Sequence, residues 1–176
     1  MLQPLGSSVK RLLFVITVYC ALLLVATGSL AEERYNRSDF NYQSYKVNTS
    51  IGFYTNQTCD FIDIDHIVSL KDAYYSGAAS WRVSKKEVFA NDKANHVPSC
   101  GRVNSSKGSA GPKDFLRRSN DGKGLEYKIV RFCEYVQRYY AVKVEYGLSF
   151  EANDSATFES CDIAIPQATG EPAESL

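Results

Sequence analysis

The residues that could do chemistry begin with an Asp-His pair, Asp65 and His66, in a chain of 176 residues that contains two histidines. An imidazole can take a proton from water near neutral pH, so His66 is a candidate general base. A neighbouring carboxylate is a hard oxygen ligand for a cation such as Mg²⁺. Adjacent side chains of a strand point to opposite faces, so the pair can share one site only where the strand ends or bulges.

Three later polar residues could complete such a site. Asn95 could accept a hydrogen bond from the His66 ring and so fix which ring nitrogen acts as base. Asn104, in a Gly/Ser-rich stretch, could supply a second oxygen ligand. Lys107 could bind a phosphate as a point charge.

Each of these residues also has a plainer interpretation. His66 alone would be an ordinary histidine at a strand end, and His96 is better explained as a structural or surface residue than as a ligand. Asp63 is a solvated strand residue or a supporting group behind Asp65. Asp72 either hydrogen-bonds near the site or caps the following helix.

The elements that must position these residues follow from periodicity and breakers. Acidic and apolar side chains alternate over residues 59–70, which predicts a strand with Asp65 and His66 at or near its end. We expect a short helix or turn over 72–81 broken at Gly77, a helix over 84–92 with Ser84 as N-cap and Glu87 at the capping-box position, loops and turns over 95–124, and an amphipathic helix over 126–146 ended by Gly147. Trp81 and Phe89 are expected in the core.

The chain ends are assigned by composition. Lys10 and Arg11 precede an apolar run that ends at the small-residue site 29–31, so we expect a secretory signal peptide over 1–31, with an uncleaved membrane anchor as the alternative. Residues 32–55 predict a polar lead-in with a strand near 50–55, residues 56–162 the functional domain, and residues 163–176 a flexible tail.

Removal of that signal leaves four cysteines, an even number that predicts two disulfides in an exported chain. The sequence leaves all three pairings open. The candidates are Cys59, Cys100, Cys133 and Cys161, and the absence of a CxxC pair disfavours a zinc site.

Net charge is zero overall but uneven. Residues 82–131 contain twelve Lys or Arg and five Asp or Glu, an excess of seven positive charges. Such a segment suits a polyanion, although a solvated face explains it equally well. Candidates for contacts to a nucleic-acid backbone are Arg102, Arg117, Arg118 and Lys123.

The order Asp-His-Ile-Val, an Asn about thirty residues later, and then Asn-x-x-Lys-Gly resembles the HNH nucleases, the ββα-metal or His-Me finger group. The stretches LKDAYYSGAASW, FANDKAN and NSSKG resemble a branch of small secreted bacterial members. The resemblance implies Asp65 and Asn104 as metal ligands, His66 as general base, Asn95 as the residue that orients its ring, and Lys107 as a phosphate contact. Ser69 stands where the family usually has Pro, and some members carry His at the last ligand position.

We therefore expect a small single α+β domain built around a ββα-metal finger with a long C-terminal core helix. The expected function is a monomeric, secreted or periplasmic bacterial endonuclease with little sequence preference. It would act on DNA or RNA with Mg²⁺ or Mn²⁺ and have no stable membrane association. The alternatives are a secreted polyanion-binding module without catalysis and a different hydrolase that uses His66 as base.

Overall fold

The computed structural model describes residues 34–122 and 126–166, and its residues from Tyr35 onward form one compact unit. The strands are β1 (Ile62–His66) and β2 (His96–Cys100); the α-helices are α2 (Leu70–Tyr75), α3 (Val83–Asn91), α4 (Gly101–Lys107), α5 (Pro112–Arg118), α6 (Phe132–Tyr146) and α7 (Ser155–Glu159); three short 3-10 helices cover Arg37–Phe40, Ala78–Ser80 and Lys93–Asn95. This small mixed α/β domain has the predicted α+β class. The expected signal peptide, Lys123 and residues 167–176 lie outside the described residues.

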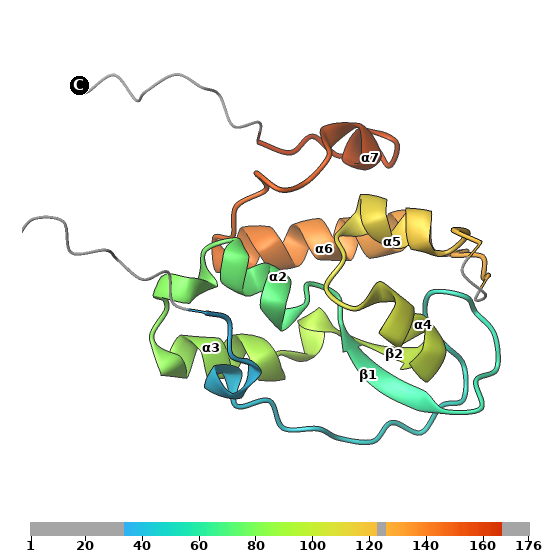
Figure 1. Ribbon diagram of the computed structural model, residues 1–176, viewed down its shortest axis with the longest axis horizontal. Coiled ribbons are helices and arrows are strands. Elements are labelled where there is room, and N and C mark those ends of the chain that lie inside the picture. The colour runs from blue at the N-terminus through green and yellow to red at the C-terminus, as the bar shows by residue number, and fades with distance from the viewer. Residues whose placement is uncertain (1–33, 123–125, 167–176) are drawn as a thin grey trace, which may run out of the picture. The chain divides into compact units, whose positions relative to one another are not determined.

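The two strands and α4 form the centre of the fold. β1 and β2 pair antiparallel, with Ile62 opposite Cys100 and His66 opposite His96. α4 follows β2 directly and packs against both strands, with α5 and α6 beyond it (Figure 1). The strand expected to end at the Asp-His pair is confirmed, since β1 ends at His66.

The prediction of loop and turn over 95–124 was wrong, because this stretch holds β2, α4 and α5. Val97, Val103 and Phe115 from these elements are buried in the core. Their burial outweighs the weak local propensity of a segment rich in Gly, Ser and Asn. Pro98 fits β2 because each strand of a two-stranded sheet is an edge strand.

α2 and α3 connect the strands. Ser69 caps α2 by accepting a hydrogen bond from the Asp72 amide, and Gly77 at φ +130 separates α2 from the next helical turn, as expected. The N-cap prediction at Ser84 was wrong. α3 begins at Val83, and Glu87 accepts a hydrogen bond from the Asn41 side chain instead of serving a capping box.

α6 supplies the long core helix. Its buried face includes Tyr135, Val136 and Tyr139, which are fully buried, and Gly147 ends it in the left-handed conformation at φ +66. The predicted start at residue 126 was too early, because the helix begins at Phe132.

Both predicted disulfides are present, and the structure resolves their pairing. Cys59 pairs with Cys100, which joins the turn before β1 to the end of β2. Cys133 pairs with Cys161, which joins α6 to the turn after α7. Each bond therefore connects elements that are distant in the sequence.

The chain ends contribute to the packing. The strand expected near residues 50–55 is absent, and only a single bridge joins Ile51 to Thr58. Phe40, in the polar lead-in, is fully buried and its ring packs on Phe89. Ile165, at the start of the expected tail, is also buried. Within residues 34–122 and 126–166, no helix has the length and apolar character needed to cross a membrane.

Candidate active site

A cavity of about 330 Å³ lies at the end of β1, where Asp65, His66 and Asn104 meet. The same cavity is lined by Tyr35, Arg37, Ile64, Ser69, Leu70, Lys71, Gly108 and Ser109. Asp65 and His66 are the last two residues of β1, and both border it. The structure thus brings together the predicted base and the two predicted ligands.

His66 is 5% exposed, and its ring is held by the backbone of α3. Nε2 lies 2.8 Å from the carbonyl oxygen of Ala90, which can only accept, so Nε2 carries the proton. Nδ1 therefore has the free lone pair, and it makes no hydrogen bond among the described residues. Burial lowers the pKa of His66 from 6.5 to about 3, so the ring is neutral near pH 7.

The second histidine packs against the first. His96 Nε2 donates to the same Ala90 carbonyl at 3.0 Å, and the two rings pack edge to face at 4.6 Å between centroids. The Tyr42 ring packs edge to face on both, at 4.7 Å from His66 and 5.6 Å from His96 between centroids. His96 Nδ1 accepts from the Tyr45 hydroxyl, as the structural interpretation of this residue expected.

The predicted hydrogen bond from the His66 ring to Asn95 is absent. Asn95 is fully buried and its amide is used by the backbone of Val68: Oδ1 accepts from Val68 N at 2.8 Å, and Nδ2 donates to Val68 O at 3.0 Å. Asn95 thus fixes the chain as it leaves β1, and the Ala90 carbonyl orients the ring.

The prediction that Lys107 contacts phosphate is contradicted by its burial. The side chain is 0% exposed, and its ammonium lies 3.0 Å from Asp65 Oδ2 and 2.8 Å from the carbonyl oxygen of His66. Tyr54 O–H also donates to Asp65. Burial raises the pKa of the Asp65 carboxyl, while Lys107 and Tyr54 act in the opposite direction. Lys107 therefore joins α4 to the end of β1 and balances the Asp65 charge.

The oxygen donors at the cavity fit a hydrated Mg²⁺ or Mn²⁺. Asp65 Oδ1 accepts one hydrogen bond, from Lys107, which leaves it a further lone pair. Asn104 uses its amide nitrogen toward Asp63 at 3.4 Å, so its amide oxygen has no partner among the described residues. No group of three or more His, Cys, Asp or Glu in the described part of the chain could hold a metal. Two protein oxygens completed by water suit Mg²⁺, which keeps several of its waters.

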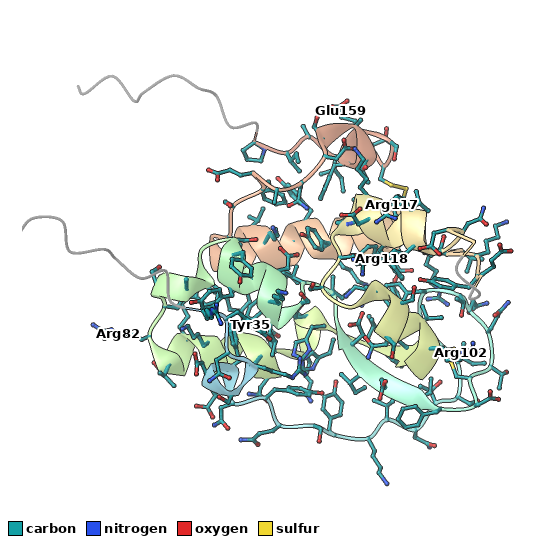
Figure 2. The ribbon with its side chains drawn as sticks, in the orientation of Figure 1. Tyr35, Arg82, Arg102, Arg117, Arg118 and Glu159 are labelled. Atoms are coloured by element: carbon teal, nitrogen blue, oxygen red, sulfur yellow. A yellow bond between two sulfur atoms is a disulfide. The ribbon has the colours of Figure 1, made fainter. Side chains whose placement is uncertain are left out.

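The basic residues do not form one patch. Figure 2 shows Arg82 and Arg102 at opposite edges of the view, with Arg117 and Arg118 on α5. Arg117 pairs with Asp114 of its own helix, and Arg118 donates to the carbonyl oxygens of Ser106 and Lys107 at the end of α4. Arg102 is exposed and lines a separate cavity with Asp63.

Two cations at the cavity were missed by the sequence analysis. Arg37 and Lys71 are both exposed and both line it. Arg37 lies in the polar lead-in, which has no periodic pattern, and Lys71 follows the helix cap Ser69. Lys71 lies five residues after His66, a proximity that marks it as a candidate, whereas no sequence signal marks Arg37.

Comparison with known proteins identifies the family. A sequence profile described as GmrSD restriction endonucleases, C-terminal domain, matches residues 18–157. The chain belongs to this family. The matched range contains β1, β2 and α4, so every residue of the cavity lies inside the GmrSD C-terminal domain.

This GmrSD-type chain is also 33% identical, over 101 residues, to an "Uncharacterized secreted protein" of Arthroderma benhamiae. The match covers 56% of this chain and 45% of the relative, so the chain spans less than half of that protein. No solved structure matches the chain. The relative is fungal, and the expected bacterial origin of this chain stays a prediction.

Proposed function

We propose that the chain is an exported, HNH-type, divalent-metal-dependent endonuclease that hydrolyses nucleic-acid phosphodiester bonds with little sequence preference. Membership of a nuclease family supports the class of activity. The observation that carries the proposal is one cavity shared by His66, with a free Nδ1, and the oxygen donors Asp65 and Asn104.

In this proposal, His66 Nδ1 takes a proton from a water molecule that attacks the phosphorus. The Ala90 carbonyl keeps the ring in the required tautomer. Asp65 and Asn104 would hold the metal ion, whose chemistry is to offset negative charge on the phosphate and the leaving oxygen. Arg37 and Lys71 take the phosphate-binding role that the sequence assigned to Lys107.

Export is supported by two observations. The domain contains two disulfides, each between elements distant in the sequence. Disulfides form and persist mainly in oxidising compartments. The fungal relative is named as a secreted protein. We propose the same destination for this chain, without a stable membrane association.

The rival function, a polyanion-binding module without catalysis, has less support. Such a module needs a continuous basic surface. Here Arg82 and Arg102 lie at opposite edges, and Lys107 is buried in an ion pair. A buried neutral histidine with one free nitrogen has no role in simple polyanion binding.

The test is cleavage of supercoiled plasmid by oxidised protein purified from the medium of an exporting host, with Mg²⁺, Mn²⁺ or chelator. His66→Ala is compared with His96→Gln, a matched control because both rings bond the same Ala90 carbonyl. We expect His66→Ala to lose at least about a hundredfold in rate, the lower range for a positioned acid-base group. His96→Gln should keep most of the activity.

Two results would overturn the proposal. One is cleavage that is unaffected by chelator. The other is equal activity of the wild type and a folded His66→Ala protein. Plasmid binding without any nicking in either metal would favour the polyanion-binding module.

A further inference from the structure

A second cavity, also of about 330 Å³, adjoins the catalytic one. The two cavities share Lys71 and Ser109 and are therefore adjacent. α2, α5 and the loop at residues 152–154 enclose it. Its volume lies at the lower end of the range of small-ligand pockets, about 300–1,000 Å³.

The charges of this cavity balance. It is lined by three basic residues and three acidic ones, namely Lys71, Lys113, Arg118, Asp72, Asp114 and Asp154. Lys113 pairs with Asp154 at 2.8 Å, and Arg118 is engaged by backbone carbonyls of α4. A cavity with balanced and largely paired charge is a poor phosphate site but suits a neutral, polar group.

An aromatic rim and a polar floor match a nucleobase. Tyr75 lines the cavity and is 60% exposed, so part of its ring is open to a stacking partner. On the floor, the Asn153 amide nitrogen donates to the Tyr139 hydroxyl at 3.1 Å, and the Asn153 amide oxygen accepts from Lys143 at 3.0 Å. Tyr139 is fully buried and its hydroxyl donates to Asp72, so the second N–H of the Asn153 amide, which has no partner among the described residues, is the group that can donate to a base edge. Bases stack on exposed aromatic rings, and amides hydrogen-bond to their edges.

Gly111 keeps the cavity open. A Cβ atom at this position would lie 3.1 Å from Asn153 Nδ2 and 3.6 Å from the Tyr139 hydroxyl. Its backbone, at φ −73, is one that any residue adopts, so conformation alone does not require glycine here. The absent side chain leaves room directly over the polar floor.

We propose that this second cavity is a base-binding subsite, which takes the base of a nucleotide next to the scissile phosphate and stacks it on Tyr75. The inference rests on the proposed nuclease function and extends it to the substrate. Entry of a base into the cavity requires that it leave its duplex stack, which costs least in a single strand. The enzyme therefore prefers single-stranded or locally unpaired nucleic acid.

The test uses a fluorescein-labelled single-stranded DNA 12-mer and the same sequence as a duplex. Binding is measured by anisotropy in chelator, and cleavage of both substrates is measured separately with Mg²⁺ or Mn²⁺. The variants are Tyr75→Ala, Tyr75→Phe, which retains the ring, and Gly111→Ala, which narrows the cavity. Val144→Ala, an exposed apolar position on α6 that lines neither cavity, is the control.

We expect wild type to bind and cleave the single strand better than the duplex. Tyr75→Ala should weaken single-strand binding at least about fivefold, the low end for one stacked base. Gly111→Ala should reduce the single-strand preference as well, while Tyr75→Phe and Val144→Ala should keep it.

The possible failures can be told apart. Cleavage that depends on His66 but is unchanged in Tyr75→Ala and Gly111→Ala overturns the subsite and leaves the proposed function intact. Tyr75-dependent binding without any cleavage supports the subsite and overturns the nuclease proposal. Absence of both binding and cleavage overturns both.

Discussion

Replacement of Lys107 by methionine separates its structural role from the phosphate contact that its sequence motif suggests. Methionine fills a similar volume but removes the ammonium that lies 3.0 Å from Asp65 and 2.8 Å from the His66 carbonyl. The Asp65 carboxylate, itself 5% exposed, then keeps only the Tyr54 hydroxyl as a hydrogen-bond donor among the described residues. The change therefore leaves a buried charge without its counter-ion.

Loss of one partner from a buried ion pair costs about 3–5 kcal/mol of unfolding free energy. This is a large part of the roughly 5–15 kcal/mol that stabilises an ordinary domain. Burial already raises the pKa of Asp65 above its ordinary value of 3.8. The contribution of this carboxyl to stability is therefore fully present below pH 3.8 and is lost as the pH rises through the folded pKa. Without Lys107 that pKa rises further, so the cost should be greater at pH 8 than at pH 5.

The assay is equilibrium unfolding in guanidinium chloride with the disulfides intact, at pH 5 and pH 8, in chelator. The double variant Asp65→Asn/Lys107→Met is the control, since removal of both partners should cost less than removal of Lys107 alone. The structural role would be refuted if the free energy of unfolding of Lys107→Met lay within about 0.5 kcal/mol of the wild-type value. A raised KM for nucleic acid in the same variant would then restore the phosphate contact.

Three further predictions concern the stability of the fold. Asn95→Ala leaves the amide and carbonyl of Val68 buried and unpaired, at about 1–3 kcal/mol each, and an unfolding free energy equal to wild type would contradict this. Removal of the Cys133–Cys161 bond, which spans 28 residues, should cost about 3.5 kcal/mol in the same assay, and a loss below about 1 kcal/mol would argue against a stabilising role. The pKa of His66 falls from 6.5 unfolded to about 3 folded, so its contribution to stability is present above 6.5 and is lost as pH decreases toward 3. Unfolding of wild type and His66→Gln across pH 3.5–7.5 in chelator checks this, because the difference between them should shrink with falling pH.

Local pattern predicted the elements whose residues alternate or repeat. β1, α2 with its break at Gly77, and the end of α6 at Gly147 all follow from signals within a few residues. α4 did not follow, because its sequence of Gly, Asn and Ser has little helical propensity and its most buried side chain is a lysine. Only the packing of Val103 on the strands and the ion pair of Lys107 explain that helix, and both depend on the tertiary structure.

The candidate site shows the same division. Asp65, His66 and Asn104 were identified from their side-chain chemistry, and the structure gathers them at one cavity. The group that orients His66 is the backbone carbonyl of Ala90, which leaves no mark in a sequence. Lys107 was misassigned for a related reason: a lysine in a Gly/Ser-rich stretch looks exposed, and only a buried carboxylate partner makes its burial favourable.

The position of Asn95 explains how an Asp-His pair can serve one site. In a continued strand, Asp65 and His66 would point to opposite faces and only one of them could border the cavity. Beyond His66 the Ile67 amide still bonds the Asn95 carbonyl, and Val68 then gives both its amide and its carbonyl to the Asn95 side chain, so the pairing with β2 ends there. Asn95 therefore acts on the direction of the chain after His66, not on the imidazole. Its loss should displace both functional side chains together and leave the tautomer of His66, set by Ala90, unchanged.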